Sequence, residues 1–326
     1  MSCRFWIALL VVLGFLWSAG LGPAKAEGLP AEESAAVVKS GMTLSEALIL
    51  GVVEGLTEYL PVSSTGHLLV AGRLLGLGEA DDGSGVEARV KEANDAYTIC
   101  IQAGAIVAVA GLYFRRLRQM GRGLAGKDAT GRNLLINVAS GFLPAALIGF
   151  LFSGMIKIFL FDIWPVVVAW FVGGVAILGV AALKPKRDRI RNPGLSLEEM
   201  SWKMALVIGL AQCIAMWPGV SRSLVTIVGG VLAGLSLPAA VEFSFLLGLI
   251  TLGAATAYDA LLHGRLMVET FDALPLIVGL AAAFGSAVLS VKWMVGYLKR
   301  HGLALFGFYR IAAALVTGAL LLSGRL

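Results

Sequence analysis

Residues 51–68, GVVEGLTEYLPVSSTGHL, combine two carboxylates, a run of three hydroxyls and an imidazole with an otherwise apolar segment. The carboxylates, Glu54 and Glu58, are four residues apart, which places them on one face of a helix. Ionisable side chains at bilayer depth cost at least ~2.5 kcal/mol each, so they normally face the protein interior or a wet cavity and mark a functional site. A kinked membrane helix with buried polar packing residues is the alternative, but it explains a lone Glu or Ser better than this dense set.

A proline divides this segment into two helical arms. Pro61 lacks an amide donor and disfavours helical geometry in the residue before it, so the first helix is expected to stop there. Ser63 or Ser64 can cap a second helix that starts near Thr65, and His67 falls within its first turn. The free amides and positive dipole end of a helix start suit a phosphate. The segment therefore predicts a helix hairpin with carboxylates on one arm and an anion-binding helix start at its tip.

A second tip is expected in WPGVSRSLVT, residues 217–226. Arg222 stands where the following helix would begin, with Ser221 and Ser223 beside it and Thr226 one turn on. A guanidinium binds phosphate oxygens in bidentate fashion and keeps its charge, so this composition indicates a phosphate site. The alternative is that Arg222 forms an internal ion pair with one of the carboxylates of the first hairpin. The two interpretations are compatible, because a resting ion pair can open to admit a ligand.

The composition is that of a polytopic membrane protein. Of 326 residues, 58% are hydrophobic and only 14% are charged, far from the averages of soluble domains. The net charge of +5 does not indicate nucleic acid, because the basic residues fall in short loops between apolar stretches. The cysteines Cys3, Cys100 and Cys213 have no paired spacing, so neither a disulfide framework nor a cysteine metal site is expected.

The first 26 residues are interpreted as a signal peptide. Arg4 precedes an apolar run, and Ala24-Lys25-Ala26 provides a small-residue cleavage site. An uncleaved first membrane span is the rival interpretation. In either case residues 27–326 are expected to form a single integral membrane domain.

Six apolar stretches of about 20 residues, the length that a bilayer core requires, are expected to be transmembrane helices. They are 96–114, 133–153, 163–183, 238–258, 273–294 and 304–323. The segments 115–132 and 184–203 are expected to be basic loops, 79–95 an acidic loop, and 154–162 a short turn. Because positive loops stay in the cytoplasm, the two basic loops are assigned to that side and the acidic loop to the outside. The first hairpin then enters and leaves the membrane from the outside.

Residues 201–234 repeat the pattern of 43–76 at an offset of 158, so that Glu54 falls on Gln212 and Ser63 on Ser221. Three spans separate the hairpins, and an odd number means that they enter from opposite sides. We therefore predict an all-α polytopic membrane protein with six transmembrane helices and two re-entrant helix hairpins. These elements are arranged as inverted-topology repeats, about 43–183 and 201–323, whose tips meet near the midplane.

Both tip motifs resemble those of a known family. EGLTEYLPVSSTGH and PGVSRSLVT are similar to the two signature motifs of the undecaprenyl-diphosphate phosphatase family, also called the bacitracin-resistance protein family. The resemblance extends to NDAYTICIQAGAIVAV and to the order of spans from about residue 42 onward, whereas the 41-residue lead-in is longer than is usual in the family. It implies hydrolysis of undecaprenyl diphosphate to the monophosphate carrier and inorganic phosphate. The expected setting is the outer side of a bacterial cytoplasmic membrane, where the reaction recycles the carrier for peptidoglycan synthesis and confers bacitracin resistance.

The resemblance also implies a set of site residues. The expected catalytic residues are Glu54, Glu58, Ser64, His67 and Arg222, and the expected phosphate-binding residues are Ser63, Thr65, Ser221, Ser223 and Thr226. A divalent cation, Mg²⁺ or Ca²⁺, is implied, and the oxygens of Glu54 and Glu58 suit either ion.

The residues themselves leave the nucleophile open among Ser64, His67 through a phosphohistidine, and an activated water. We favour Ser64, with Glu58 as its base because Glu58 is nearer the break, and Glu54 as the metal ligand. Expected partners are a polyprenyl diphosphate lipid and membrane lipids but no nucleic acid, and the sequence is compatible with a homodimer. A lipid-phosphate transporter or flippase of the same architecture is the alternative function, because fold alone does not fix function.

Overall fold

The computed structural model describes residues 42–77, 85–160, 162–183 and 194–326. Within these residues the regular structure is helical, apart from an isolated β-bridge between Leu195 and Leu235. The expected signal peptide, 1–26, lies outside the described residues, as do residues 78–84 and 184–193 of the expected loops.

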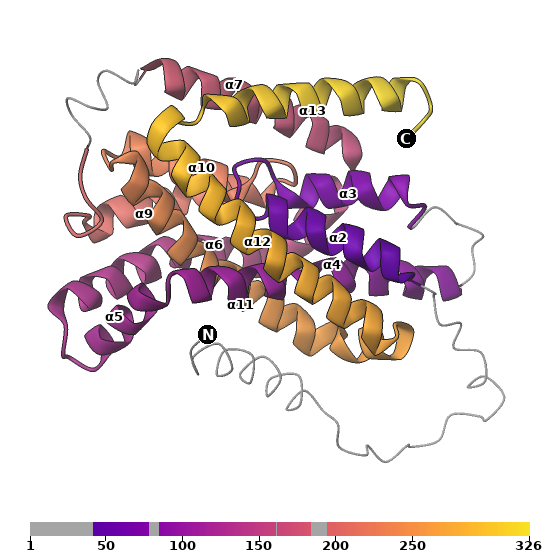
Figure 1. The fold of residues 1–326 in the computed structure, drawn as a ribbon, viewed down its shortest axis with the longest axis horizontal. Helices are drawn as coiled ribbons and strands as arrows, with labels where there is room; N and C mark the ends of the chain where they lie inside the picture. Colours follow the sequence, from indigo (N-terminus) through magenta and orange to yellow (C-terminus); the bar gives the residue numbers. More distant parts are fainter. Residues whose placement is uncertain (1–41, 78–84, 161, 184–193) are drawn as a thin grey trace, which may run out of the picture.

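The described residues form eleven α-helices and one 3-10 turn (Figure 1). In chain order they are α2 (Leu44–Thr57), α3 (Ser64–Leu74), α4 (Gly85–Leu112), α5 (Phe114–Leu124), α6 (Ala129–Leu160), α7 (Ile163–Leu183), α9 (Trp202–Gln212), η1 (Cys213–Met216), α10 (Arg222–Leu232), α11 (Leu237–Thr270), α12 (Ala273–His301) and α13 (Ala304–Leu322).

Five of these helices are long and apolar enough to cross a membrane, namely α6, α7, α11, α12 and α13. A sixth candidate is the pair Ala96–Leu112 and Phe114–Leu124, which is bent by 77° at the junction of α4 and α5. These six regions coincide with the six apolar stretches of the sequence. The protein is therefore an all-helical, multi-pass membrane protein, as the composition predicts.

The helices run farther than the apolar stretches do, and this corrects the expected loops. The acidic segment is already helical from Gly85 onward, α5 and the start of α6 occupy most of 115–132, and α6 continues to Leu160 through the expected turn. Hydropathy marks the part of a helix that suits the bilayer core, not its end. Residues such as Ala, Glu, Lys and Arg favour helix, so a helix continues past its apolar part until a breaker or a cap intervenes.

The first helix of each hairpin packs against a long helix from the other half of the chain. α2 packs along α12, and α9 packs along α6. A Cβ at Gly51 of α2 would collide with the carbonyl of Gly279 in α12, and one at Gly209 of α9 would collide with the backbone of Gly141 in α6. The offset of 158 maps Gly51 onto Gly209. Both halves thus use an equivalent glycine for a close helix crossing.

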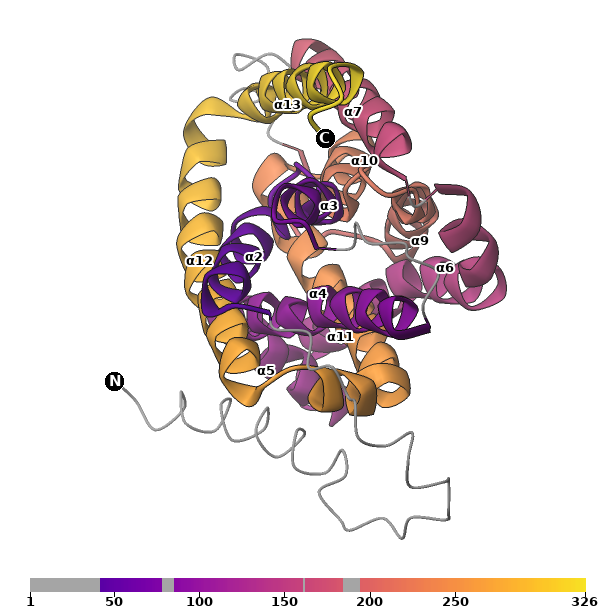
Figure 2. The ribbon, with the colours of Figure 1, turned by 90° about the vertical axis from the view of Figure 1, so that its right-hand side faces the viewer.

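The long helices surround the two shorter ones that follow the breaks. α4 packs along α11, and α7 along α13. Seen end on, α3 and α10 lie toward the middle, with α12, the α7–α13 pair and α6 around them (Figure 2). The breaks before α3 and α10 are therefore held in the interior of the bundle.

Candidate active site

The first tip, residues 58–63, joins α2 to α3. α2 ends at Thr57, slightly before the expected position next to Pro61, and α3 begins at Ser64. Ser63 is the N-cap, and its hydroxyl accepts a hydrogen bond from the Gly66 amide at 3.5 Å. The predicted helix, break and helix are confirmed, and Ser63 rather than Ser64 is the cap.

The second tip, residues 217–221, has the same local design. Ser221 caps α10 by accepting a hydrogen bond from the Leu224 amide at 3.3 Å, and Arg222 is the first residue of that helix, as expected. Ser63 and Ser221 have φ of 75° and 77°, and within the described residues no other non-glycine residue has a positive φ. Such a backbone costs of order 1–3 kcal/mol and clusters at functional sites. The strain therefore marks both tips.

Three members of the expected catalytic set are in contact. Ser64 Oγ donates a hydrogen bond to Glu58 Oε2, and Arg222 Nη2 donates to Glu58 Oε1 at 3.3 Å. Glu58 and Arg222 form an ion pair whose side chains are only 6% and 10% exposed. Glu58 thus links a hydroxyl of the first hairpin to the guanidinium of the second, and the ion pair considered from the sequence is present.

Arg222 is held on several sides. Its Nη1 donates to the Ser244 carbonyl at 3.1 Å, and its guanidinium carbon lies 5.4 Å from the centroid of the Tyr59 ring. A Cβ added at Gly248 of α11 would collide with the guanidinium. The position of this cation is therefore fixed by packing as well as by charge.

The hydroxyls expected to bind phosphate differ in their surroundings. Ser223 Oγ donates to the Leu60 carbonyl at 2.7 Å and joins the two tips directly. Thr226 Oγ1 donates to the Arg222 carbonyl at 2.8 Å, and neither Ser223 nor Thr226 is exposed at all. Ser63 and Ser221 cap their helices, and Thr65 is partly buried in the first turn of α3. In this structure Ser223 therefore links the two tips, whereas Thr226 bonds within its own helix and to Ser244 of α11.

His67 is fixed at both ring nitrogens. Nδ1 lies 2.6 Å from the Ser63 carbonyl oxygen, and Nε2 lies 2.7 Å from the Tyr309 hydroxyl. A carbonyl only accepts, so Nδ1 carries the proton, and in a neutral imidazole Nε2 then accepts from Tyr309. The ring also lies 4.7 Å from that of Trp170. His67 is thus oriented by α13 and by its own cap residue.

Glu54 is a buried carboxylate for which the described residues supply no N–H or hydroxyl donor. Its side chain is 1% exposed, and no donor among the described residues contacts either carboxylate oxygen. A buried carboxylate normally has a hydrogen bond or a counter-charge. The two free oxygens suit a hard divalent cation. No group of three or more His, Cys, Asp or Glu side chains in the described residues gathers as a metal cage.

Sequence reasoning missed three residues near the tips, all of them polar groups inside apolar spans. Gln102 of α4 donates to Glu58 Oε2 at 3.3 Å, and Tyr309 and Arg310 of α13 contact His67 and the tip backbone. An arginine in the middle of a membrane span is itself a functional signal. That signal was present in the stretch 304–323.

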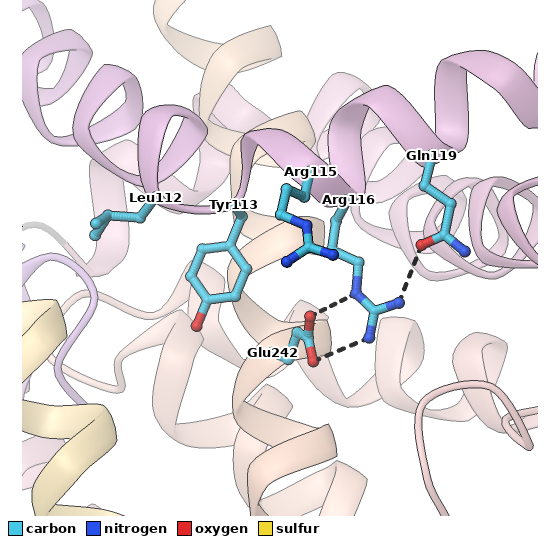
Figure 3. Close-up of a pocket in the computed structure, with 6 residues that line it drawn as sticks. All are labelled: Leu112, Tyr113, Arg115, Arg116, Gln119 and Glu242. Carbon is cyan, nitrogen blue, oxygen red and sulfur yellow. Dashed lines mark hydrogen bonds and ion pairs between the residues drawn. The ribbon is translucent and has the colours of Figure 1, made fainter. Parts of the chain in front are cut away.

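A separate cavity lies away from the two tips. It has a volume of 680 Å³ and sits where α4 bends into α5 (Figure 3). Its lining includes Tyr113, Arg115 and Arg116, and Arg116 is held by Glu242 at 2.7 Å and by Glu198 at 2.9 Å. None of the expected site residues lines it. We therefore do not assign the phosphate chemistry to this cavity.

Comparison with known proteins shows the family to which the chain is similar. The profile of the family described as "Bacitracin resistance protein BacA" matches residues 47–316. The undecaprenyl-diphosphatase of Sorangium cellulosum is 46% identical over 269 residues, which cover 82% of this chain and 83% of that protein. The undecaprenyl-diphosphatase of Nitrosomonas eutropha is 42% identical over 275 residues, covering 84% and 93%.

A third relative, undecaprenyl-diphosphatase 2 of Rhodospirillum rubrum, is 42% identical over 281 residues, which cover 86% of this chain and 96% of that protein. The matches include both hairpins and the spans between them. With a family profile that spans most of its length and relatives this similar over nearly their whole chains, the protein belongs to the bacitracin resistance protein BacA family.

Proposed function

We propose that this protein hydrolyses undecaprenyl diphosphate to undecaprenyl phosphate and inorganic phosphate. The observation that carries the proposal is the line of contacts from Ser64 through Glu58 to Arg222, which joins a nucleophile, a base and a phosphate-binding cation from two hairpins. Its relatives are named undecaprenyl-diphosphatases, and groups of these kinds can supply the positioning and charge stabilisation that phosphoryl transfer needs. Release of the carrier monophosphate accounts for recycling of the lipid and for bacitracin resistance.

The chemistry begins at Ser64. As its Oγ attacks the terminal phosphorus, its proton passes to Glu58 Oε2, and the bond between that phosphorus and the bridging oxygen breaks. Undecaprenyl phosphate leaves, and a phosphoserine remains. Water then attacks the phosphorus of the phosphoserine, and the bond between that phosphorus and Ser64 Oγ breaks. Glu58 returns its proton to Oγ, and inorganic phosphate departs as H₂PO₄⁻ with both protons of the water. Phosphoryl transfer depends on positioning and charge stabilisation, and here both come from the tips.

In this scheme Arg222 stabilises the negative charge of the phosphate. Its ion pair with Glu58 opens when the phosphate arrives, and the guanidinium then turns its donors to the equatorial oxygens. Amides at the starts of α3 and α10 add donors at the positive ends of two helix dipoles. His67, in the first turn of α3, remains the alternative nucleophile together with an activated water.

We also propose that a divalent cation, Mg²⁺ or Ca²⁺, assists the reaction. Glu54 is the protein ligand that best suits it, because both of its buried oxygens lack a donor within the described residues. Glu58 is the second candidate. When bound, the ion would neutralise charge on the diphosphate, which lowers the barrier to attack by an anionic group.

We further propose the finer topology: six transmembrane helices and two re-entrant hairpins in inverted repeats, in the cytoplasmic membrane, with the site opening to the periplasm. The equivalent crossings of α2 on α12 and of α9 on α6 support the repeats. A cysteine at exposed Ser323 should react with an impermeant thiol reagent in intact cells, and one at exposed Lys127 should not. The test uses a background without the native cysteines, and the reverse pattern would place the site in the cytoplasm.

Phosphate release by the purified protein in detergent tests the function. Undecaprenyl diphosphate should yield stoichiometric phosphate without any second compartment, and Ser64→Ala should abolish turnover. A flippase would move the same lipid across a bilayer but release no phosphate. Absence of phosphate release from folded, metal-supplied protein would therefore favour the transporter.

A further inference from the structure

Arg310 is a cation buried in the centre of the bundle. It lies in the apolar helix α13 and is not exposed at all. Its Nη2 donates to the carbonyls of Gly219 and Ala169, each at 2.8 Å, and its Nη1 lies 3.4 Å from the carbonyl of Pro61. One guanidinium therefore contacts the backbone of both tips and of α7.

The two tip carbonyls are equivalent positions of the sequence repeat. Adding the offset of 158 to Pro61 gives Gly219, and each of these residues comes two positions before the strained cap serine of its tip, Ser63 or Ser221. Arg310 thus reaches the same carbonyl in each half of the molecule. An arginine that only filled space would not be expected to bond equivalent carbonyls in two segments that are far apart in sequence.

Arg310 forms no ion pair with any residue in the described part of the chain. Its recorded partners are carbonyl oxygens, and no acceptor among the described residues contacts its Nε. A buried charge without a counter-charge is strongly disfavoured, and in a membrane span it is a functional signal. The carbonyl dipoles of the two tips offset part of the free-energy cost of burying this charge. Because both tips bond the same guanidinium, their positions relative to each other are also constrained.

We propose that Arg310 is a positioning residue that sets the separation of the two tips, and so the Ser64–Glu58–Arg222 contact. It acts through the backbone, because its recorded hydrogen bonds go to carbonyls and not to side chains of the catalytic set. The inference rests on the proposed function for its kinetic readout. Its structural readout, the protection of the tip amides, does not depend on any activity.

A substitution at a neighbouring residue can displace the Arg310 guanidinium while Arg310 itself is kept. A Cβ at Gly173 of α7 would collide with Nη2 and would lie 2.9 Å from Cζ and 3.0 Å from Nε. The obstructing atoms are the end of a flexible side chain, so Gly173→Ala should push the guanidinium aside while the helix stays in place. Gly179 on the same helix has nothing within 4 Å of a Cβ, so Gly179→Ala is a matched control.

The experiment compares the unaltered protein with Gly173→Ala, Gly179→Ala and Arg310→Lys in nanodiscs. Hydrogen exchange is followed by mass spectrometry in peptides that cover 58–66 and 217–224, and kcat and KM are measured with undecaprenyl diphosphate. We expect Gly173→Ala and Arg310→Lys to raise exchange in both peptides together and to lower kcat by roughly 10- to 100-fold, since a 1 Å misplacement can reduce rate about 10²-fold. KM should change by less than about threefold, because substrate contacts remain.

Three outcomes would overturn the proposal. The first is unchanged exchange in both tips of a folded Gly173→Ala protein. The second is a change in the second tip alone, which would make Arg310 a local anchor between α7 and that tip. The third is a rise in KM at constant kcat, which would place Arg310 on the substrate. If the unaltered protein releases no phosphate, the proposed function fails, while the exchange data still decide the role of Arg310.

Discussion

Gly248→Ala should disable the site by moving Arg222 without changing any polar group. A Cβ at this position of α11 would stand 2.5 Å from Arg222 Cζ and 2.8 Å from Nη2. Ordinary contacts at a Cβ begin at 3.4 Å, so the guanidinium must move by about 1 Å. Glycine at this position therefore makes room for the guanidinium of Arg222.

The size of the effect follows from two hydrogen bonds. Arg222 donates to the Ser244 carbonyl at 3.1 Å and to Glu58 at 3.3 Å, and N–H···O bonds are normally no longer than ~3.2 Å. Both distances are already at the upper end of this range, so a shift of about 1 Å that lengthens either of them breaks that bond and displaces the cation from its place in the site. Misplacement on this scale lowers rate by roughly 10²-fold, which corresponds to about 2.7 kcal/mol in the barrier.

Phosphate release from undecaprenyl diphosphate by purified protein provides the assay. Gly253→Ala on the same helix is the control, because nothing lies within 4 Å of a Cβ there, and it should keep full activity. Thermal unfolding of both variants verifies that the helix is intact. The reasoning is refuted if folded Gly248→Ala keeps kcat within about threefold of the unaltered protein, or if Gly253→Ala loses as much activity.

Three further substitutions probe separate groups. Glu54→Gln should lower metal affinity, so that raising Mg²⁺ or Ca²⁺ restores part of kcat; loss of kcat at every metal concentration would contradict the ligand role. Arg222→Lys should lose nearly as much activity as Arg222→Ala, about 10²- to 10³-fold, because an ammonium has no bidentate fork; retention of most activity would make Arg222 a general counter-charge. Tyr309→Phe should free Nε2 of His67 and lower kcat by about tenfold through loss of ring orientation, and an increase in phosphohistidine instead would identify His67 as the nucleophile.

The tips could be predicted from the sequence because their signals are local. Pro61 interrupts a helix wherever it stands, serines cap the helices that follow, and the offset of 158 reveals the second tip once the first is known. The contact of Glu58 with Ser64 follows from their closeness on either side of the break. The ion pair of Arg222 with Glu58 also appeared among the sequence interpretations, because a buried charge needs a partner.

Contacts between distant segments could not be predicted in the same way. Ser223 donates to the carbonyl of Leu60 in the other tip, and this contact depends on how the two hairpins meet, which no local pattern around Ser223 indicates. Tyr309 reaches His67 across 242 positions of the chain, and no local pattern encodes that pairing. Several helices were predicted to end too early, at the limits of their apolar stretches. Hydropathy indicates where a helix leaves the membrane core and not where its backbone hydrogen bonding ends.

The central claim is that the two tips form one catalytic site, and a double-mutant cycle across them tests it most directly. kcat/KM would be measured for the unaltered protein, Glu58→Gln, Arg222→Ala and the double variant. Groups that act as a unit give strongly non-additive losses, so the double variant should be about as impaired as the worse single variant. Losses that multiply, so that the double variant falls by the product of the two single effects, would show that Glu58 and Arg222 act independently and would contradict the account.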